Sequence, residues 1–316
     1  MIAVVGAGAF GTALAVVQAT EGRAVTLWGR DEAAMAAAAA TREHPALPGV
    51  SLPPGLTVTA DLPSAADIVL LAVPAQATGD FLRERGGALP EAPLVLCAKG
   101  IDGRGLRLQT GIAAEALPGR ALAALTGPGF AGEIAHGLPS ALTLACADLT
   151  LGRILQAGLS TRRLRLYLTD DVIGAQLGGA LKNVIAIACG MVEGAGLGHS
   201  ARAALMTRGF AEMTRLAVAM GARPETLSGL SGLGDLSLTC NSMQSRNFAL
   251  GRALGAGAAR PGGTVEGVAT ARAACELGAR HGVELPIAEA VANVLDASAS
   301  LAEAMEALMS RPLKEE

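Results

Sequence analysis

Residues 1–20 read MIAVVGAGAFGTALAVVQAT. The β-branched run 2–5 predicts a short strand, and the apolar spacing of residues 12–20 predicts a helix. Three glycines with the spacing GxGxxG join the two elements: Gly6, Gly8 and Gly11. Such glycines permit a tight turn and the close approach of a pyrophosphate, whose charge meets the free amides and the dipole of the helix N-terminus. The stretch therefore predicts a dinucleotide-binding turn.

Further apolar runs predict the remaining strands of one sheet, at residues 24–28, 67–73, 94–98, 122–126, 141–145 and 164–168. An alanine-rich helix and a Pro/Gly-rich excursion fill residues 31–66 and suggest no chemistry. After residue 169 the strand signals stop and helical spacing continues. We therefore expect an α/β fold, with a Rossmann-type doubly wound sheet in residues 1–169 and an all-α domain in residues 170–316.

The predicted strand ends supply candidate ligand contacts, because ligands collect at the carboxyl ends of strands in doubly wound sheets. Val73 and Pro74 end one strand, and Lys99 follows another. Arg30 and Asp31 follow the end of the second predicted strand. A carboxylate at this place usually binds the ribose of NAD, whereas an arginine accommodates the 2′-phosphate of NADP. Both cofactors stay open, and the position of Arg30 favours NADP.

Residues 174–199 read GAQLGGALKNVIAIACGMVEGAGLGH. The stretch is apolar enough for a protein interior, yet it contains Lys182. On a helix, mostly small residues share the face of this lysine, namely Ala175, Gly178, Gly179, Ala186, Cys189 and Glu193. We expect this face to leave room for a ligand. A bulky residue at Gly178 or Ala186 would then impair catalysis before it impairs folding.

Lys182 has two interpretations. A structural lysine extends to water or ends in a salt bridge. A partly desolvated ammonium, with its pKa lowered by burial, would instead carry a proton in catalysis. Asp235 is the only carboxylate in residues 229–239. It is a candidate partner for Lys182 or for a substrate hydroxyl, unless it only caps the helix that begins at Leu236.

Two further polar groups interrupt the helical half. Ser245 has the pattern of a helix N-cap, which would place Arg246 and Asn247 in the first turn. An arginine beside free helix amides can bind phosphate, although an exposed arginine without such a role is equally compatible with the sequence. Glu266, within residues 264–267, is the candidate contact of the second group.

The composition limits the class of protein. Hydrophobic residues make up 51% of the 316 residues and the net charge is -3, which indicates a folded protein and gives no reason to expect nucleic acid as a partner. Five scattered cysteines and four histidines lack the spacing of metal ligands, so we predict reduced thiols and no metal. We expect neither a signal peptide nor a membrane span, and a cytoplasmic location.

Ten short motifs together resemble the bacterial-type NAD(P)-dependent glycerol-3-phosphate dehydrogenases. In chain order they begin at the residues named here: GAGAFGTALA at Gly6, LWGR at Leu27, VP at Val73, AKG at Ala98, GPGFAGE at Gly127, QLGGALKNVIAIA at Gln176, TRGFAEM at Thr207, GLGDLSLTC at Gly232, QSRN at Gln244 and VEG at Val265. They share one order and similar intervals with that family. This is far more specific than the glycine motif alone.

The resemblance implies reduction of dihydroxyacetone phosphate to sn-glycerol 3-phosphate for phospholipid synthesis, with Lys182 as general acid or base and a homodimer as the assembly. It implies substrate contacts at Lys99, Gly127, Gly129, Lys182, Asn183, Asp235, Ser245, Arg246 and Asn247. With the motif-based candidates, the expected cofactor contacts are Gly6, Gly8, Ala9, Phe10, Gly11, Arg30, Val73, Pro74, Lys99, Ala131, Arg246, Thr264 and Glu266.

The sequence departs from the family pattern at two positions. Gly129 stands where the family usually has a serine or threonine that touches the substrate, and Ala9 replaces the usual serine before Phe10. Two other functions stay open. One is a β-hydroxyacid or 6-phosphogluconate-type dehydrogenase, which would act on a carboxylate. The other is a nucleotide sensor without catalysis, against which Lys99, Lys182 and Asp235 argue.

Overall fold

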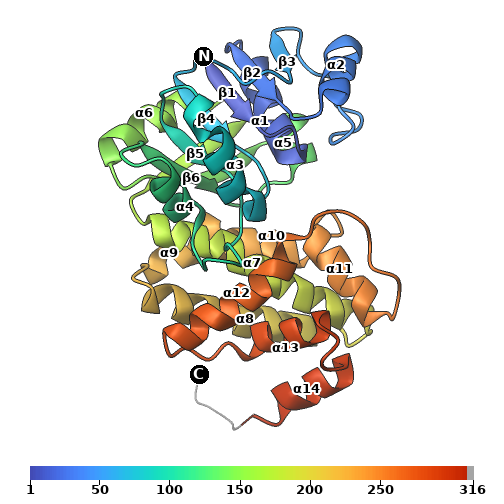
Figure 1. The fold of residues 1–316 in the computed structure, drawn as a ribbon. Coiled ribbons are helices and arrows are strands. Elements are labelled where there is room, and N and C mark those ends of the chain that lie inside the picture. The colour runs from blue at the N-terminus through green and yellow to red at the C-terminus, as the bar shows by residue number, and fades with distance from the viewer. Residues whose placement is uncertain (312–316) are drawn as a thin grey trace. The chain divides into compact units, whose positions relative to one another are not determined.

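The computed structural model describes residues 1–311. The chain forms two compact units (Figure 1). Unit 1 contains Met1–Lys99 and Arg107–Gln176, and unit 2 contains Gly100–Leu106 and the chain from Leu177 onward. The domain boundary expected after residue 169 stays a prediction, and the compact unit extends seven residues beyond it, to Gln176.

Unit 1 holds one sheet, whose eight strands within the described residues follow the order β3-β2-β1-β4-β5-β6-β7-β8. The strands are β1 (Ile2–Val5), β2 (Val25–Trp28), β3 (Leu56–Thr59), β4 (Ile68–Leu71), β5 (Leu94–Leu96), β6 (Leu122–Thr126), β7 (Ser140–Ala145) and β8 (Leu164–Thr169). All pairs are parallel except the antiparallel pair β6 and β7. The expected α/β architecture is confirmed.

The strand β3 was not predicted. Its four residues, Leu56–Thr59, follow a Pro/Gly-rich segment and lie at the edge of the sheet, and only Leu56 among them is buried. A short, half-exposed edge strand gives a weak apolar signal in sequence. The other seven strands lie where apolar runs predicted them, although the run 67–73 is a strand only over Ile68–Leu71.

Helices pack on both faces of the sheet, and two buried clusters mark the two layers. One cluster joins the sheet to α1 (Ala9–Thr20), α5 (Ala131–Ala135) and α6 (Leu149–Leu159). The other joins it to α3 (Thr78–Arg85) and α4 (Gln109–Ala116). α2 (Glu32–Thr41) packs beside β3. Because the central strands are buried on both sides, their sequences are continuous apolar runs.

Unit 2 is helical. Its elements are α7 (Val172–Gly194, from Leu177 on), α8 (His199–Ala219), α9 (Pro224–Ser228), α10 (Asp235–Cys240), α11 (Arg246–Gly255), α12 (Glu266–Arg280), α13 (Pro286–Leu295) and α14 (Leu301–Met309). α7 runs among the other helices of this unit (Figure 1). The last described helix is α14, and residues 312–316, at the end of the expected all-α domain, lie outside the described part.

α7 is the core helix of unit 2. By length and a mean hydropathy of 1.5 it would also suffice to cross a membrane, but 89% of its most apolar window is buried inside the protein. A core helix of a folded protein has the same composition. The sequence stretch that was expected to be a buried helix carrying Lys182 is therefore one.

The expected role of the small residues on α7 is wrong for Gly178. A side-chain carbon added there would lie 2.6 Å from the carbonyl oxygen of Ser231. Gly190 is similar, since an added carbon would lie 2.2 Å from the carbonyl oxygen of Phe248 on α11. These glycines allow neighbouring backbone to pack directly on α7, so their small size serves folding and leaves no ligand space at these two positions.

Candidate active site

The glycines of the first motif have separate structural roles in the turn between β1 and α1. Gly6 has φ +118°, and an added carbon would lie 2.7 Å from the backbone of Ala72. At Gly11 an added carbon would lie 2.0 Å from the carbonyl oxygen of Gly6. An added carbon at Gly8, the N-cap of α1, would meet no atom within 4 Å among the described residues. The open approach at Gly8 and the helix amides behind it are suited to an anion.

Arg30 and Asp31, the two candidate residues for distinguishing NADP from NAD, follow β2 and have different environments. Asp31 is the N-cap of α2, and its carboxylate accepts a hydrogen bond of 3.0 Å from the backbone N–H of Ala34. Arg30 is exposed. The carboxylate is thus engaged in capping its own helix, whereas the guanidinium faces solvent.

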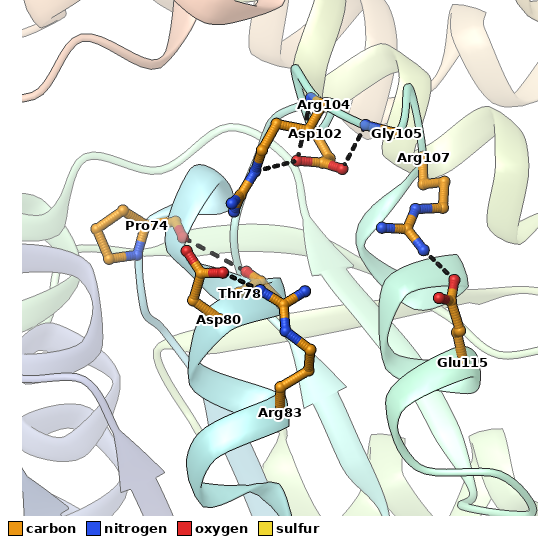
Figure 2. Close-up of polar contacts among 9 residues, drawn as sticks. All are labelled: Pro74, Thr78, Asp80, Arg83, Asp102, Arg104, Gly105, Arg107 and Glu115. Atoms are coloured by element: carbon orange, nitrogen blue, oxygen red, sulfur yellow. Dashed lines mark hydrogen bonds and ion pairs between the residues drawn. The ribbon is translucent and has the colours of Figure 1, made fainter.

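Val73 and Pro74 follow the carboxyl end of β4, which lies beside the carboxyl end of β1, where the glycine turn begins. The Pro74 carbonyl accepts a hydrogen bond of 3.4 Å from the Thr78 hydroxyl, which closes the short turn into α3 (Figure 2). Asp80 and Arg83 form an ion pair along that helix. The predicted contact residues therefore lie on a fixed turn next to Gly6.

Lys99 lies at the end of β5 and contacts two other predicted site residues. Its Nζ donates a hydrogen bond of 2.6 Å to the Gly127 carbonyl and lies 5.8 Å from the ring centroid of Phe10. The ammonium thus bridges the segment after β6 and the first turn of α1, where Ala9 is the first helical residue. Several predicted cofactor and substrate contacts of unit 1 are brought together here.

The departure at Gly129 has a visible structural correlate. A side-chain carbon added there would lie 2.9 Å from Cδ1 of Ile134 in α5. A serine at this position would require the Ile134 side chain to shift. Ala131 begins the same short helix. The Ile134 side chain therefore lies close to the position that a side chain at residue 129 would occupy.

The segment after Lys99, Gly100–Leu106, belongs to unit 2. Hydrogen bonds to the Asp102 carboxylate stabilise it. Asp102 is buried and accepts hydrogen bonds from the backbone N–H groups of Gly105, at 2.8 Å, and Arg104, at 3.4 Å (Figure 2). The Arg104 side chain lies 4.0 Å from the same carboxylate. These bonds fold Gly100–Leu106 into a tight turn.

In unit 2, Lys182 forms a buried cluster with Asp235 and Thr239. Its Nζ donates a hydrogen bond of 2.8 Å to Asp235 Oδ1 and another of 2.6 Å to Thr239 Oγ1. Thr239 Oγ1 in turn donates to Asp235 Oδ1 at 3.3 Å. The exposed fractions are only 7%, 1% and 2% for Lys182, Asp235 and Thr239. A carboxylate at this distance in the interior stabilises the ammonium form of the lysine.

Thr239 was missed by the sequence analysis. It lies four residues after Asp235 on α10, so both side chains project from the same face of that helix. This spacing within GLGDLSLTC was the available signal. Asp235 was considered as a helix cap, but it is the first residue of α10 and its side chain turns to Lys182 instead.

A π-helical turn, Leu230–Gly234, directly precedes Asp235 and positions it beside Lys182. The turn is packed by glycine: an added carbon at Gly232 would lie 1.9 Å from the carbonyl oxygen of Leu227. Ser231, in the same turn, lies against Gly178 of α7. Close backbone packing on α7 therefore fixes the start of α10, and with it the carboxylate.

The second polar group lies at the start of α11. Ser245 is the predicted N-cap, and its hydroxyl accepts a hydrogen bond of 3.2 Å from the Phe248 N–H. Arg246 is exposed in the first turn. Asn247 donates through Nδ2 to Oδ1 of Asn183, at 2.9 Å. An exposed guanidinium beside free helix amides is suited to a phosphate group.

Glu266 is the first residue of α12 and is half-buried, and Thr264 just before it is exposed. The Glu266 carbonyl accepts a hydrogen bond of 2.8 Å from the Thr270 hydroxyl one turn later. An added carbon at Gly263 would lie 3.9 Å from Nη1 of Arg246. The segment before α12 thus runs close to the arginine.

Two other buried titratable groups, Cys240 and Glu212, have shifted pKa values. Contact with Cys189 and burial hold the pKa of the Cys240 thiol well above its ordinary value, so this thiol is neutral beside the lysine cluster. Burial raises the pKa of the Glu212 carboxyl to about 7. Glu212 accepts hydrogen bonds from the backbone N–H groups of Ile287, at 2.9 Å, and Ala288, at 3.4 Å, and so caps α13.

The described residues, 1–311, contain no group of three or more His, Cys, Asp or Glu side chains arranged to hold a metal ion. In unit 1 the glycine turn, Lys99 and the strand ends can receive a dinucleotide. In unit 2 a buried ammonium and an exposed arginine can donate a proton and bind an anion.

Two family descriptions match successive parts of the chain. Residues 1–151 match the family described as NAD-dependent glycerol-3-phosphate dehydrogenase N-terminus, and residues 171–306 match the corresponding C-terminus. The chain is 57% identical over 319 residues to the glycerol-3-phosphate dehydrogenase [NAD(P)+] of Paracoccus denitrificans, covering 100% of this chain and 99% of the relative. The corresponding protein of Cereibacter sphaeroides is also 57% identical, with 100% of both chains covered.

A solved structure agrees with these relatives. The crystal structure of glycerol-3-phosphate dehydrogenase from Coxiella burnetii matches with a TM-score of 0.93 and 35% identity, over 98% of each chain. The similarity therefore extends over both units.

Proposed function

The chain belongs to the NAD-dependent glycerol-3-phosphate dehydrogenase family, and from this we propose that it reduces dihydroxyacetone phosphate to sn-glycerol 3-phosphate with a nicotinamide dinucleotide. Members of this family are NAD(P)-dependent oxidoreductases that act on a CH–OH group. The observation that carries the proposal for this chain is the buried cluster of Lys182, Asp235 and Thr239.

Lys182 is the proposed general acid. When bound, the nicotinamide supplies a hydride to the ketone carbon, and the oxygen becomes an alkoxide that must be protonated as it forms. The ammonium of Lys182 carries a transferable proton, and it donates a hydrogen bond of 2.8 Å to Asp235 Oδ1. In the oxidative direction the neutral amine accepts the hydroxyl proton. Thr239 holds the amine at a fixed position, at 2.6 Å.

The substrate phosphate is proposed to bind at Arg246. The Ser245 cap fixes the first turn of α11, and its amides with the exposed guanidinium offer several donors to a dianion. Binding of the phosphate far from the reacting carbon orients the ketone and lowers the entropic part of the barrier. Asn183 and Lys99 remain proposed substrate contacts.

The cofactor is proposed to bind at the β1–α1 turn, with its pyrophosphate on the amides at Gly8. NADP is the preferred form in this proposal, because Arg30 is exposed at the end of β2 while the Asp31 carboxylate accepts from Ala34 N at 3.0 Å. Phe10, Ala131, Thr264 and Glu266 are the further proposed contacts.

The activity is tested by following NADPH oxidation with and without dihydroxyacetone phosphate, and repeating both with NADH. We expect turnover only with the ketone phosphate, and faster with NADPH at low cofactor concentration. Equal or greater turnover with β-keto acids or 3-oxo sugar acids would favour a hydroxyacid dehydrogenase. Tight NADPH binding with no turnover on any ketone would favour a nucleotide sensor.

We further propose that the product enters glycerophospholipid synthesis, that the protein works in the cytoplasm and that it forms a homodimer. The family resemblance supports each of these. Cell fractionation checks the location, and light scattering on the purified protein checks the assembly. A glycerol requirement after depletion of the protein would check the metabolic role.

A further inference from the structure

The first turn of α12 is held by a side chain from another helix. Oδ1 of Asn247, on α11, accepts a hydrogen bond of 2.9 Å from the backbone N–H of Gly267. Val265, the N-cap residue of α12, has an apolar side chain that cannot accept a hydrogen bond. Asn247 therefore does for α12 what an N-cap side chain normally does, since helix N-termini leave their first N–H groups without partners in the helix.

A second asparagine fixes the orientation of this cap. Nδ2 of Asn247 donates to Oδ1 of Asn183, at 2.9 Å. A carboxamide can present either its oxygen or its nitrogen to a neighbour, and the acceptor on Asn183 selects the rotamer that aims Oδ1 at α12. Asn183 directly follows Lys182, so three helices, α7, α11 and α12, meet at one pair of amides.

Gly267 makes the contact possible. A side-chain carbon added there would lie 2.6 Å from Oδ1 of Asn247, 2.8 Å from the Asn183 carbonyl oxygen and 2.8 Å from Cδ1 of Ile187. Any other residue would push α12 away from α7. The glycine in the VEG motif is thus explained by close packing, and the residue before it, Glu266, begins a helix that packs closely against α7.

We propose that Asn247 is a positioning residue for the cofactor: by capping α12 it holds the turn that carries Thr264 and Glu266, with Asn183 setting its orientation. This rests on the proposed function, which assigns the cofactor to Thr264 and Glu266. The family resemblance assigns Asn247 to the substrate alone. The two bonds of its carboxamide point instead to the element that precedes the cofactor contacts.

The matched variants are Asn247→Ala, Asn247→Asp and Asn241→Ala. Asn247→Ala removes the cap. Asn247→Asp keeps an acceptor for Gly267, and a carboxylate is favourable at a helix N-terminus, while the Asn183 amide can turn its N–H toward it. Asn241 is exposed, donates only locally to the Ser237 carbonyl at 2.8 Å and serves as the control.

The measurements are the Kd of NADPH by fluorescence in the absence of substrate, the KM of dihydroxyacetone phosphate and the Tm. Loss of a cap corresponds to roughly 10-fold in an equilibrium constant. We expect Asn247→Ala to weaken NADPH binding by about that factor, with Asn247→Asp and Asn241→Ala close to the unmodified protein. The carboxylate of Asn247→Asp, next to Arg246, should still raise the KM of the phosphate substrate.

An unchanged NADPH Kd in Asn247→Ala, with a raised substrate KM, would overturn the inference and leave Asn247 as a substrate contact. An equal loss of NADPH affinity in the Ala and Asp variants would also overturn it. If Asn247→Ala does not fold, Asn183→Ala decides, because it frees the cap to rotate: a weakened NADPH Kd supports the inference and an unchanged one overturns it. Failure of the unmodified protein to bind NADPH, or to reduce the ketone, would instead refute the proposed function.

Discussion

Lys182 sits in the interior with a carboxylate and a hydroxyl as its hydrogen-bond acceptors, so a change at this residue affects both chemistry and folding. We predict that Lys182→Ala lowers kcat by roughly 10³-fold or more, because the alkoxide loses its proton donor. NADPH affinity should be nearly intact, since the proposed cofactor contacts of unit 1 are unaltered. Stopped-flow turnover and fluorescence titration measure the two quantities.

Two controls accompany this variant. Asp235 would be left charged with an exposed fraction of 1%, which is strongly destabilising, so Lys182→Ala/Asp235→Asn separates loss of folding from loss of chemistry. Lys182→Arg keeps the positive charge but holds its proton too tightly to transfer it. Retention of most activity in Lys182→Ala would refute the acid role, and an active Lys182→Arg would reduce it to charge stabilisation.

Arg30 tests the cofactor preference at the same scale. We predict that Arg30→Ala weakens NADPH binding by about 10-fold, the loss of a charge-assisted hydrogen bond to a phosphate, and changes NADH binding much less. The variant leaves Asp31 as the cap of α2, so the local fold is preserved. Equal losses for the two cofactors, measured as Kd values at one ionic strength, would contradict the assignment.

At the scale of elements, the close packing of helices on α7 decides where the catalytic groups lie. We predict that Gly178→Ala lowers the free energy of unfolding by about 1–3 kcal/mol, because the added carbon would lie 2.6 Å from the Ser231 carbonyl oxygen. Denaturant unfolding measures the change. Gly111→Ala on α4 is the control, since its added carbon meets no described atom within 4 Å and should be neutral or stabilising. If Gly178→Ala is as stable as the unmodified protein, close packing does not explain the glycine, and the expectation that this face of α7 leaves room for a ligand is supported again.

The cap of α13 predicts a pH dependence. Burial raises the pKa of Glu212 from 4.5 to about 7 in the folded protein. The folded state therefore holds the proton more tightly than the unfolded chain, and the stability linked to this group is full below pH 4.5 and lost as the pH rises through about 7. The difference corresponds to roughly 3 kcal/mol.

Glu212→Gln removes this titration. Urea unfolding of both proteins at several pH values between 5 and 8.5 should show the variant gaining stability relative to the unmodified protein as the pH rises, by roughly 1–3 kcal/mol. Since all other titratable groups are shared, they cancel in the difference. A difference that stays constant over this range, or shrinks, would contradict a raised pKa at Glu212.

At the scale of the whole molecule, sequence predicted those features that depend on local pattern. The strand 2–5, the glycine turn and the Ser245 cap follow from residues adjacent in the chain. Features that depend on residues distant in sequence were not visible: the contact of Gly178 with Ser231, the hydroxyl of Thr239 on the lysine, and the half-exposed strand β3. The sequence was enough to predict the candidate reacting groups, but not the backbone packing that positions them.

The end of unit 1 offers the last test, because the compact unit extends past the predicted boundary at residue 169. Gln176 accepts a hydrogen bond of 3.0 Å from the Thr110 N–H and donates one of 2.8 Å to the Thr110 hydroxyl, which together cap α4. Ala175 and Val172 pack against Ala124 and Ala145 of the sheet. The first turn of α7 therefore contributes apolar burial and two hydrogen bonds to unit 1.

We predict that a fragment of residues 1–176 is more stable than a fragment of residues 1–169 by roughly 2–3 kcal/mol, or about 4–10 °C in Tm. Thermal unfolding by circular dichroism measures the difference. The same 1–176 fragment with Gln176→Ala is the control, and it should lose the part that comes from the cap of α4 while keeping the part from Val172 and Ala175. Equal Tm values for all three fragments would place the boundary at residue 169, because the turn would then add nothing to unit 1.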